Sequence, residues 1–470
     1  MDKDLQARQE ARQIAKAAFE AQKQLARMSQ QQLDAIVEAI SCAFYSVAPE
    51  LAQLAVQETG FGNVEDKITK NRFASRTVYE AVKNMKTVGV LSESKAEKLW
   101  QVGVPVGVIA AIVPSTNPTS TVCYKAMVSL KAGNAIVFSP HPKALTCTLR
   151  AAEIVTKAAQ AAGAPVGAVG CLTIPSLDGC KELMGEKHVS MILATGGPAM
   201  VRAAYSSGKP AIGVGAGNGP AYIHKSANIA EALKKIVRSK TFDNGTVCAS
   251  EQSIIVEKDL EQQVIAEGTK LGLYFMNPQE AESLAKLLFR PSGALNPEIV
   301  GRPARELADK AGFTVPATTK VLVAYEQEAG PTRPYSMEKL CPVLAFFVME
   351  NEDTVLNKCV EILTHEGSGH TFAMHCADEA VIQKFALRIP VSRFLVNTPA
   401  ALGGIGATTG LFPALTLGCG AVGGSSSSNN ISPLDLVNIR RVAWDQEQQP
   451  ENDLIEILTT KILQRLENAT

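Results

Sequence analysis

One cysteine among ten is singled out by the residues around it. The stretch "FDNGTVCASEQ" (242–252) places Cys248 three residues after an Asn-Gly pair and just before "SIIVEKDL", an apolar run typical of a strand. A cysteine thiolate is a nucleophile, but a cysteine chosen at random is more often a small buried hydrophobic residue. The local pattern therefore leaves two alternatives for Cys248, a catalytic nucleophile and a buried structural residue.

Three further segments have the composition of ligand-binding loops. They are "IVPSTNP" (112–118), "FSPHPKA" (138–144) and "ATGGPAM" (194–200), each at the carboxyl end of a predicted strand and rich in Pro, Gly or small polar residues. Ligands bind at such strand ends in doubly wound sheets. None of the three is GxGxxG, and the GxGxG in "GVGAGNG" (213–219) is weak alone. These patterns predict an α/β protein that binds a nucleotide.

Composition limits the classes of function. The chain has 470 residues, 46% of them hydrophobic, which is enough for two or three lobes, and its formal net charge is zero. Balanced charge favours neither nucleic acid nor an anionic membrane as a partner. The charged N-terminus lacks a secretory pattern and no apolar run reaches roughly 18 residues, so we expect a soluble intracellular protein. No CxxC occurs, and we predict free thiols and no metal site.

The elements that must position these residues follow from periodicity. Residues 3–95 are mostly helical in pattern, with Gly60 ending a helix. From about 102, short apolar runs alternate with helical stretches, which indicates parallel βαβ units. A second α/β block covers roughly 223–430, and composition alone makes "LGCGAVGGSSSSNN" (417–430) a flexible linker.

The C-terminus has a different pattern. A polar stretch (445–453) precedes "LIEILTTKILQRLENAT", in which Leu454, Leu458, Ile462 and Leu466 recur every four residues. This spacing predicts a short amphipathic helix behind a linker. Such a helix either docks on its own domain or enters a groove of another protein, and the pattern leaves both open.

Six motifs taken together resemble those of a known family. "VPSTNPTST", "FSPHPKA", "GVGAGNGP", "FDNGTVCASEQ", "EKLCPVLAFF" and "LTLGCGAVGG" are similar, in order, to motifs of the CoA-acylating aldehyde dehydrogenases, and the resemblance runs from about residue 5 to 445. It implies an α/β aldehyde dehydrogenase fold. The expected parts are a Rossmann-like NAD-binding domain with N-terminal helices (1–222), an α/β catalytic domain (223–430), an oligomerisation arm (431–445), and a linker with an amphipathic targeting helix (446–470).

The resemblance implies that Cys248 is the nucleophile. Its thiolate would add to an aldehyde, and the thiohemiacetal would lose hydride to the nicotinamide and leave a thioester. Asn117 matches the family's side-chain amide donor to the developing oxyanion, with the backbone N–H of Cys248 as the second donor. The thiol pKa should then be depressed, and because the motif holds no basic residue, we expect backbone amides or the cofactor to depress it. Alone, Asn117 would be an ordinary turn residue.

Cofactor contacts are implied at two places. Gly196 and Gly197 match the glycine turn near the pyrophosphate, where small residues let phosphate approach the backbone. Glu338 matches the glutamate that holds the nicotinamide ribose, although alone it could be a solvated surface acid.

Two further matches concern the adenosine end and CoA. Ser139 and Pro140 belong to the segment at the adenosine ribose, and Ser139 and Pro142 stand where hydrolytic relatives carry a lysine and a glutamate. We therefore expect NAD without excluding NADP. His370 matches a histidine of the acylating group, with a role in CoA binding or proton transfer, or a structural role.

One absence separates two reactions. Hydrolytic aldehyde dehydrogenases use a glutamate on the strand before the catalytic cysteine to activate water, but residues 196–230 contain no Asp or Glu. Water is a poor nucleophile toward a thioester without a base, whereas a second thiol is a good one. The sequence therefore predicts that CoA resolves the thioester, and the alternative is a hydrolytic enzyme that releases a carboxylic acid.

The same resemblance suggests partners and location. The substrate would be a short aliphatic aldehyde, and "ISPLDLVNIRRVAW" resembles the arm that builds a homodimer or tetramer. The C-terminal helix is similar to tags that bring enzymes into bacterial microcompartments. We thus expect a cytoplasmic enzyme, inside such a compartment, that contacts a shell protein or other cargo through residues 451–470. A non-catalytic scaffold or cargo protein is a third hypothesis.

Overall fold

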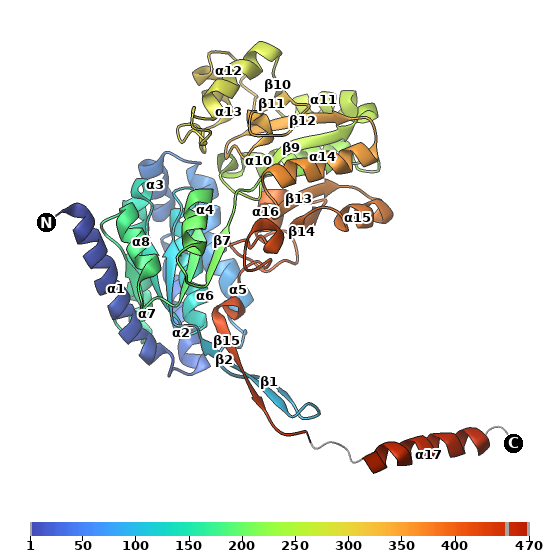
Figure 1. Cartoon of the computed structure of the whole chain (residues 1–470). Coiled ribbons are helices and arrows are strands. Elements are labelled where there is room, and N and C mark those ends of the chain that lie inside the picture. Colours follow the sequence, from blue (N-terminus) through green and yellow to red (C-terminus); the bar gives the residue numbers. More distant parts are fainter. Residues whose placement is uncertain (1, 447–450, 468–470) are drawn as a thin grey trace.

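Two parallel sheets organise the molecule. The computed structural model describes residues 2–446 and 451–467 and contains two α/β lobes (Figure 1). The first sheet has five strands in the order β5 (Val169–Cys171), β4 (Ala135–Ser139), β3 (Val108–Ile112), β6 (Met191–Thr195) and β7 (Ala211–Val214). The second has seven, in the order β10 (Leu273–Phe275), β11 (Val321–Tyr325), β12 (Val343–Met349), β9 (Glu251–Glu257), β8 (Gly219–Ile223), β13 (Gly369–His375) and β14 (Val391–Val396).

The apolar runs that predicted strands are the buried centres of these sheets. Every residue of β3 and β4 is buried, as their continuous apolar sequences require of strands covered on both faces. The apolar run "CLTIP" (171–175) is typical of a strand, but β5 ends at Cys171. The strands β7, β8 and β13 were not predicted. Glycines interrupt or border all three, and β13 buries polar side chains such as His370.

Helices cover the first lobe. They are α1 (Lys3–Leu25), α2 (Gln30–Ser46), α3 (Ala48–Thr59), α4 (Val64–Arg72), α5 (Val78–Val82), α6 (Pro118–Lys131), α7 (Leu145–Ala161), α8 (Leu177–Gly185) and α9 (Pro198–Tyr205), with the π-turn η1 (Phe73–Thr77) between α4 and α5. As predicted, Gly60 ends a helix, and it does so in the left-handed conformation with φ 69°. The apolar stripe before it is broken at Val47 into α2 and α3, because Pro49 begins a new helix.

The second lobe carries a further set of helices. They are α10 (Ile229–Thr241), α11 (Glu261–Lys270), α12 (Pro278–Leu288), α13 (Ala304–Lys310), α14 (Glu352–His365), α15 (Glu379–Ala386) and α16 (Ala400–Gly404). The predicted domain boundary after residue 222 falls inside β8, which pairs in the seven-stranded sheet. The chain changes sheet between β7 and β8, at residues 215–218.

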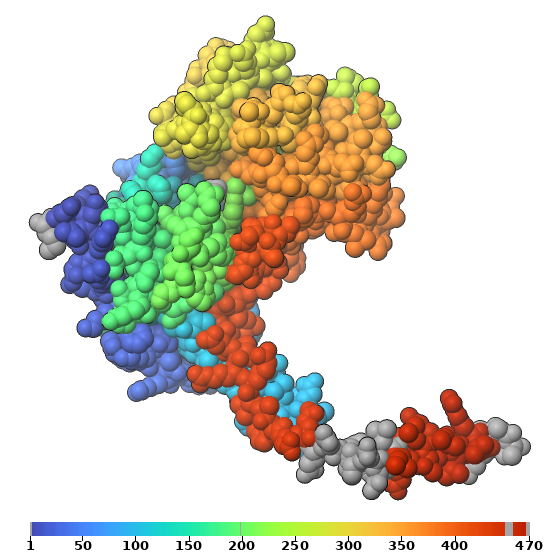
Figure 2. Space-filling model, viewed as in Figure 1, coloured from blue at the N-terminus to red at the C-terminus, as the bar shows by residue number. Residues whose placement is uncertain are grey.

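The segment after β14 returns to the first lobe. Leu417, Ile431 and Leu436 belong to the hydrophobic core of that lobe, and Figure 2 shows the orange-red end of the chain running down its side. Composition alone predicts a flexible linker at 417–430, whereas the resemblance favours a loop near the active-site mouth at 415–424. The linker prediction is wrong, because Cys419 is buried and the Gly418 N–H donates to the Asn429 carbonyl at 2.9 Å.

A three-stranded antiparallel sheet projects from the first lobe (Figure 1). It contains β1 (Gly89–Ser94), β2 (Leu99–Pro105) and β15 (Val437–Ala443), with β15 at one edge. The predicted arm (431–445) therefore includes a real strand. Its pairing with the β1–β2 hairpin was not foreseen.

The last helix, α17 (Glu451–Glu467), stands apart from both lobes (Figures 1 and 2). Its apolar side chains at Ile455, Leu458 and Ile462 are more than half exposed. The described part of α17 thus does not bury this face on its own lobes, which was one of the two alternatives. In the described parts of the chain no single helix has the length and apolarity to cross a membrane; only the bent pair α2–α3 passes on length and composition.

Candidate active site

Two adjoining cavities lie where the predicted ligand-binding loops meet. The larger has a volume of about 560 Å³ and is lined from the first lobe by Asn117, Gly196 and Gly197, and from the second by Cys248 and Glu338. The smaller, of about 420 Å³, lies over the ends of β3, β4 and β6. Thr195, Gly196 and Gly197 line both cavities, so the two cavities form one connected site. The larger one brings together Asn117 and Cys248, which are 131 positions apart in the sequence.

Cys248 is presented by a turn of unusual backbone geometry. After α10 the chain passes through the short helix η3 (Phe242–Gly245), in which Asp243 and Asn244 have φ of 47° and 51°. Both are left-handed, a conformation that Asp and Asn tolerate better than most residues. Cys248 follows at partial exposure in the larger cavity, directly before β9.

Burial and the neighbouring charges set the pKa of the Cys248 thiol. Burial raises the pKa of its thiol to about 12, and the Glu338 carboxylate adds to the rise. Burial therefore outweighs the local backbone amides, and depression of the pKa by the bound cofactor stays a prediction. Arg393, only 2% exposed, is a nearby cation that lowers the pKa without overcoming burial. The sequence analysis missed Arg393, which lies on β14, far from Cys248 in the chain.

Arg393 also fixes the loop beside the thiol. Its Nη2 donates to the carbonyls of Gly418 at 2.7 Å and Gly369 at 3.2 Å. Within the described chain it forms no salt bridge, so a cation is buried among carbonyl dipoles close to Cys248.

Asn117 lines the larger cavity from the first lobe. It precedes Pro118 at the start of α6, and its side chain does not cap that helix. Its Oδ1 accepts a hydrogen bond from Lys70 Nζ, and its Nδ2 donates to Thr116 Oγ1 at 3.2 Å. Lys70, which lies in α4 and is 2% exposed, was not among the predicted site residues.

Glu338 is not a solvated surface acid. Its Oε1 accepts from the Gly217 N–H at 2.9 Å, and its own N–H donates to Glu366 Oε2 at 2.7 Å. Burial, together with the charge of Glu366, raises the pKa of Glu338 to about 8. Among the described residues that line the larger cavity, Glu338 is the single carboxylate.

His370 lies behind the cavity wall and does not line it. Its Nδ1 shares a 2.8 Å hydrogen bond with Thr371 Oγ1, while Nε2 is buried without a partner. Burial, with a smaller contribution from Arg393, lowers the pKa of His370 to about 3, so the ring is neutral. A methyl group on Gly217 would lie 1.8 Å from the Cys248 carbonyl oxygen and 3.2 Å from His370 Cε1, which places Gly217 against both.

The smaller cavity contains the predicted adenosine segment. Ser139 and Pro140 line it together with Gly196 and Gly197. A methyl group on Gly197 would meet nothing within 4 Å, so this turn leaves open space where a phosphate could approach. Thr195 Oγ1 is buried without a hydrogen-bond partner. A polar atom in that state, the open glycine turn and the apolar cleft together fit a dinucleotide.

The chain is similar to aldehyde dehydrogenases over most of its length. Residues 3–272 match the aldehyde dehydrogenase family. The bifunctional aldehyde-alcohol dehydrogenase AdhE of Escherichia coli K12 is 43% identical over 90% of this chain and 48% of its own, so the chain spans about half the length of such curated relatives. The acetylating succinate-semialdehyde dehydrogenase of Clostridium kluyveri is 35% identical, over 92% of this chain and 95% of its own.

Solved structures agree over the whole fold. A probable aldehyde dehydrogenase of Listeria monocytogenes is 55% identical with a TM-score of 0.94, covering 96% of this chain and 100% of its own. An acetylating aldehyde dehydrogenase of Geobacillus thermoglucosidasius is 47% identical with a TM-score of 0.93, covering 96% and 99%.

Two propionaldehyde dehydrogenases are more distant, each with a TM-score of 0.84. The protein from a Clostridium phytofermentans fucose utilisation microcompartment is 28% identical and covers 94% of this chain and 98% of its own. The Rhodopseudomonas palustris protein, solved with CoA and an acylated cysteine, is 29% identical and covers 92% and 97%. The family match and the full-length similarity to acetylating enzymes lead to one conclusion: the chain belongs to the CoA-acylating branch of the aldehyde dehydrogenase family.

Proposed function

We propose that the chain converts a short aliphatic aldehyde, NAD and CoA into acyl-CoA and NADH, reversibly, through a thioester on Cys248. One observation carries the proposal: Cys248 and Asn117 face a single cavity that continues along an open glycine turn. A nucleophile, an amide donor and a place for a dinucleotide are the parts that aldehyde oxidation needs.

Each residue has a defined task in this reaction. The Cys248 thiolate adds to the aldehyde carbon, and the Asn117 amide together with the Cys248 N–H stabilises the negative charge that forms on the oxygen. NAD, when bound, supplies the hydride acceptor. Glu338 would hold the nicotinamide ribose, Gly196 and Gly197 the pyrophosphate, and Ser139 and Pro140 the adenosine. NADP stays an alternative, because neither Ser139 nor Pro140 offers a carboxylate to repel a 2′-phosphate.

Deacylation is assigned to CoA because a base for water is missing. The residues between β6 and α10 contain no acid, and Glu338 is engaged with the Gly217 N–H. His370 is assigned to CoA binding from the resemblance alone: its Nε2 is free to accept a hydrogen bond, but a pKa lowered to about 3 makes the ring a poor base for the CoA thiol. The Rhodopseudomonas palustris relative with bound CoA supports the same choice of acceptor.

We also propose that the enzyme is a homodimer or tetramer. The strand β15 is the edge of its sheet, with exposed residues along its second half, and an edge strand presents backbone groups for pairing. The helix α17 would direct the assembly into a bacterial microcompartment by binding a shell protein or other cargo through residues 451–470. The exposed apolar face at Ile455, Leu458 and Ile462 supports this, as does the microcompartment origin of one relative.

The test is NADH formation from propionaldehyde and NAD, with and without CoA, for the wild type and Cys248→Ala. We expect turnover that requires CoA and disappears in the variant. Steady NADH formation without CoA would instead mean that water resolves the thioester, as in the hydrolytic alternative. Full turnover by Cys248→Ala would remove the nucleophile from the proposal, and no turnover by either protein would favour a scaffold.

A further inference from the structure

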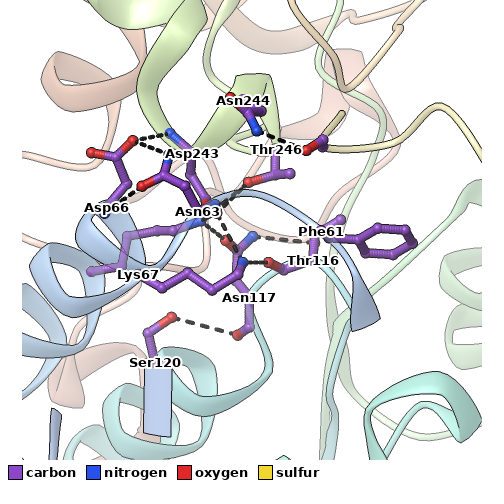
Figure 3. A network of polar contacts seen from close by, with 12 residues as sticks. Phe61, Asn63, Asp66, Lys67, Thr116, Asn117, Ser120, Asp243, Asn244 and Thr246 are labelled. Atoms are coloured by element: carbon purple, nitrogen blue, oxygen red, sulfur yellow. Dashed lines mark hydrogen bonds and ion pairs between the residues drawn. The ribbon is translucent and has the colours of Figure 1, made fainter. Parts of the chain in front are cut away.

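A buried network of charges lies directly behind the Asn117 amide. Figure 3 shows Asn117 and Thr116 beside Lys67, Asp243 and Thr246. Lys70 Nζ donates to Asn117 Oδ1, to Asp243 Oδ2 and, at 3.2 Å, to Thr246 Oγ1. These contacts bring α4 and the turn before Cys248 into one cluster with the start of α6.

The contact with Lys70 determines which end of the amide faces the cavity. The oxygen and nitrogen of an asparagine side chain are nearly equal in size, so packing alone does not choose between them. An ammonium group has three donors and no acceptor, and it therefore accepts only the oxygen as its neighbour. With Oδ1 held by Lys70 and one Nδ2 hydrogen directed to Thr116, the second Nδ2 hydrogen remains for a ligand in the cavity.

Asp243 holds Lys70 in place. Its Oδ2 is paired with Lys70 and with Lys67, the latter at 2.9 Å, and it accepts from Thr246 Oγ1 at 2.6 Å. All these groups are buried. A methyl group on Gly62 would lie 1.8 Å from Asp243 Oδ1, so the chain closes tightly around this carboxylate. The cations around Asp243 hold its pKa below the usual value despite burial, and the carboxylate stays charged.

We propose that Lys70 is a positioning residue that orients the Asn117 amide, with its N–H toward the aldehyde oxygen, and that Asp243 anchors Lys70 for this task. The proposal rests on the donor role proposed above for Asn117. Asp243 is also five residues before Cys248, so the same carboxylate ties the nucleophile's turn to the amide donor. Lys70 touches neither substrate nor cofactor in this arrangement and acts through Asn117.

Lys67 supplies a matched control. It is buried in the same helix, pairs with the same Asp243 oxygen and donates to the Thr116 carbonyl at 3.0 Å, but within the described chain it makes no hydrogen bond to the Asn117 side chain. A general loss of structure from removing a buried lysine should appear in Lys67→Met and Lys70→Met alike. An effect transmitted through Asn117 should appear only in the second.

The experiment is a double-mutant cycle on CoA-dependent turnover. We expect Asn117→Ala to lower kcat by about 100-fold or more, as for loss of an oxyanion donor, and Lys70→Met to lower it by about tenfold or more. In the Asn117→Ala background Lys70→Met should cost less than about twofold, whereas Lys67→Met should have the same relative effect in both backgrounds. Alkylation of Cys248 by iodoacetamide forms no oxyanion, so its rate should change less than about twofold in Lys70→Met.

Each contrary result has one meaning. An unchanged kcat in Asn117→Ala would contradict the donor role itself. A loss in Asn117→Ala with independent, multiplicative effects of Lys70→Met would overturn the positioning role, as would slowed alkylation parallel to the loss of turnover. If Lys70→Met does not fold, Lys70→Met with Asp243→Asn removes Lys70 together with its anion, although Lys67 then lacks its partner, and the same cycle is measured from Asp243→Asn, in which Lys67 is equally unpaired.

Discussion

The two sides of the larger cavity differ in how their charges are balanced. On the amide side, comprising Asn117, Lys70, Lys67 and Asp243, each charged group meets an opposite charge at hydrogen-bond distance. On the thiol side, comprising Cys248, Glu338, His370 and Arg393, the ionisable groups lack such partners.

The pKa values on the thiol side show the consequence. Burial raises the pKa values of Cys248 and Glu338 and lowers that of His370, so these three groups are neutral near pH 7; it also lowers the pKa of Arg393, which stays a cation. The amide side is therefore held in place by its own ion pairs before ligands bind. The charges of the thiol side depend on what binds, since any charge brought into that buried space changes their balance.

The largest expected difference comes from making the same change on each side. Asp243→Asn leaves Lys67 and Lys70 buried without an anion, which should cost about 3–5 kcal/mol of stability. Glu338→Gln removes a carboxyl whose pKa is already about 8 and should cost far less near pH 7. Urea unfolding curves at pH 7 measure both. Equal midpoints for the two variants would contradict the comparison.

The thiol side makes a prediction about pH. Because the pKa of Cys248 is raised to about 12, the thiolate fraction, and with it the rate of iodoacetamide alkylation, should rise about tenfold per pH unit between pH 7 and 8. Above pH 8 Glu338 becomes charged and opposes the thiolate, so the rise should become less steep.

Glu338→Gln separates the two groups. It should react at the wild-type rate below pH 8 and several-fold faster above it, because the opposing carboxylate is gone. A rate that is flat from pH 7 to 9 in the wild type would mean that the thiol is already ionised, and the thiol side would then be assembled in advance as well.

How much of this site could be predicted depended on how local each signal is. Cys248 and Asn117 lie in short motifs that resemble those of the family, and both line one cavity. Lys70 meets Asn117 across 47 residues and Asp243 across 173, so no window along the sequence contains the network. The cation near Cys248 was not foreseen for the same reason, since Arg393 reaches the site only through the folding of β14 beside β13.

The fold shows the same division. Continuous apolar runs identified β3, β4 and β6, where burial on both faces leaves a strong pattern. The β1–β2 hairpin and its pairing with β15 carry exposed and half-buried residues, and such strands lack that pattern. Composition could not predict that 417–430 packs on the first lobe, because glycine and serine are common both in tight loops and in linkers.

The smaller cavity offers a test, with a smaller expected effect, of where the pyrophosphate of NAD binds. Gly197 has φ of −64°, so alanine fits its backbone, and the added methyl group would project into open space where a phosphate is proposed. Gly197→Ala should raise the KM for NAD by about tenfold, or about 1.4 kcal/mol, with little change in stability. Gly185→Ala, also in open space but outside both cavities, is the control. An unchanged KM would place the pyrophosphate elsewhere.

The smallest effect is expected where neither side is touched. A chain ending at Gln446 keeps the edge-to-face contact of Trp100 with Trp444 and the hydrogen bond from Gln446 to the Glu97 carbonyl, so the arm should fold and assemble as before. Its kcat and KM values should stay within about twofold of the full chain's, since α17 stands apart from both lobes. Recruitment to a microcompartment shell, followed with a fluorescent fusion, should be lost. If turnover fell as well, α17 would act on the catalytic lobes. The comparison of a prearranged amide side with a ligand-dependent thiol side would then need α17 as a third contributor to activity.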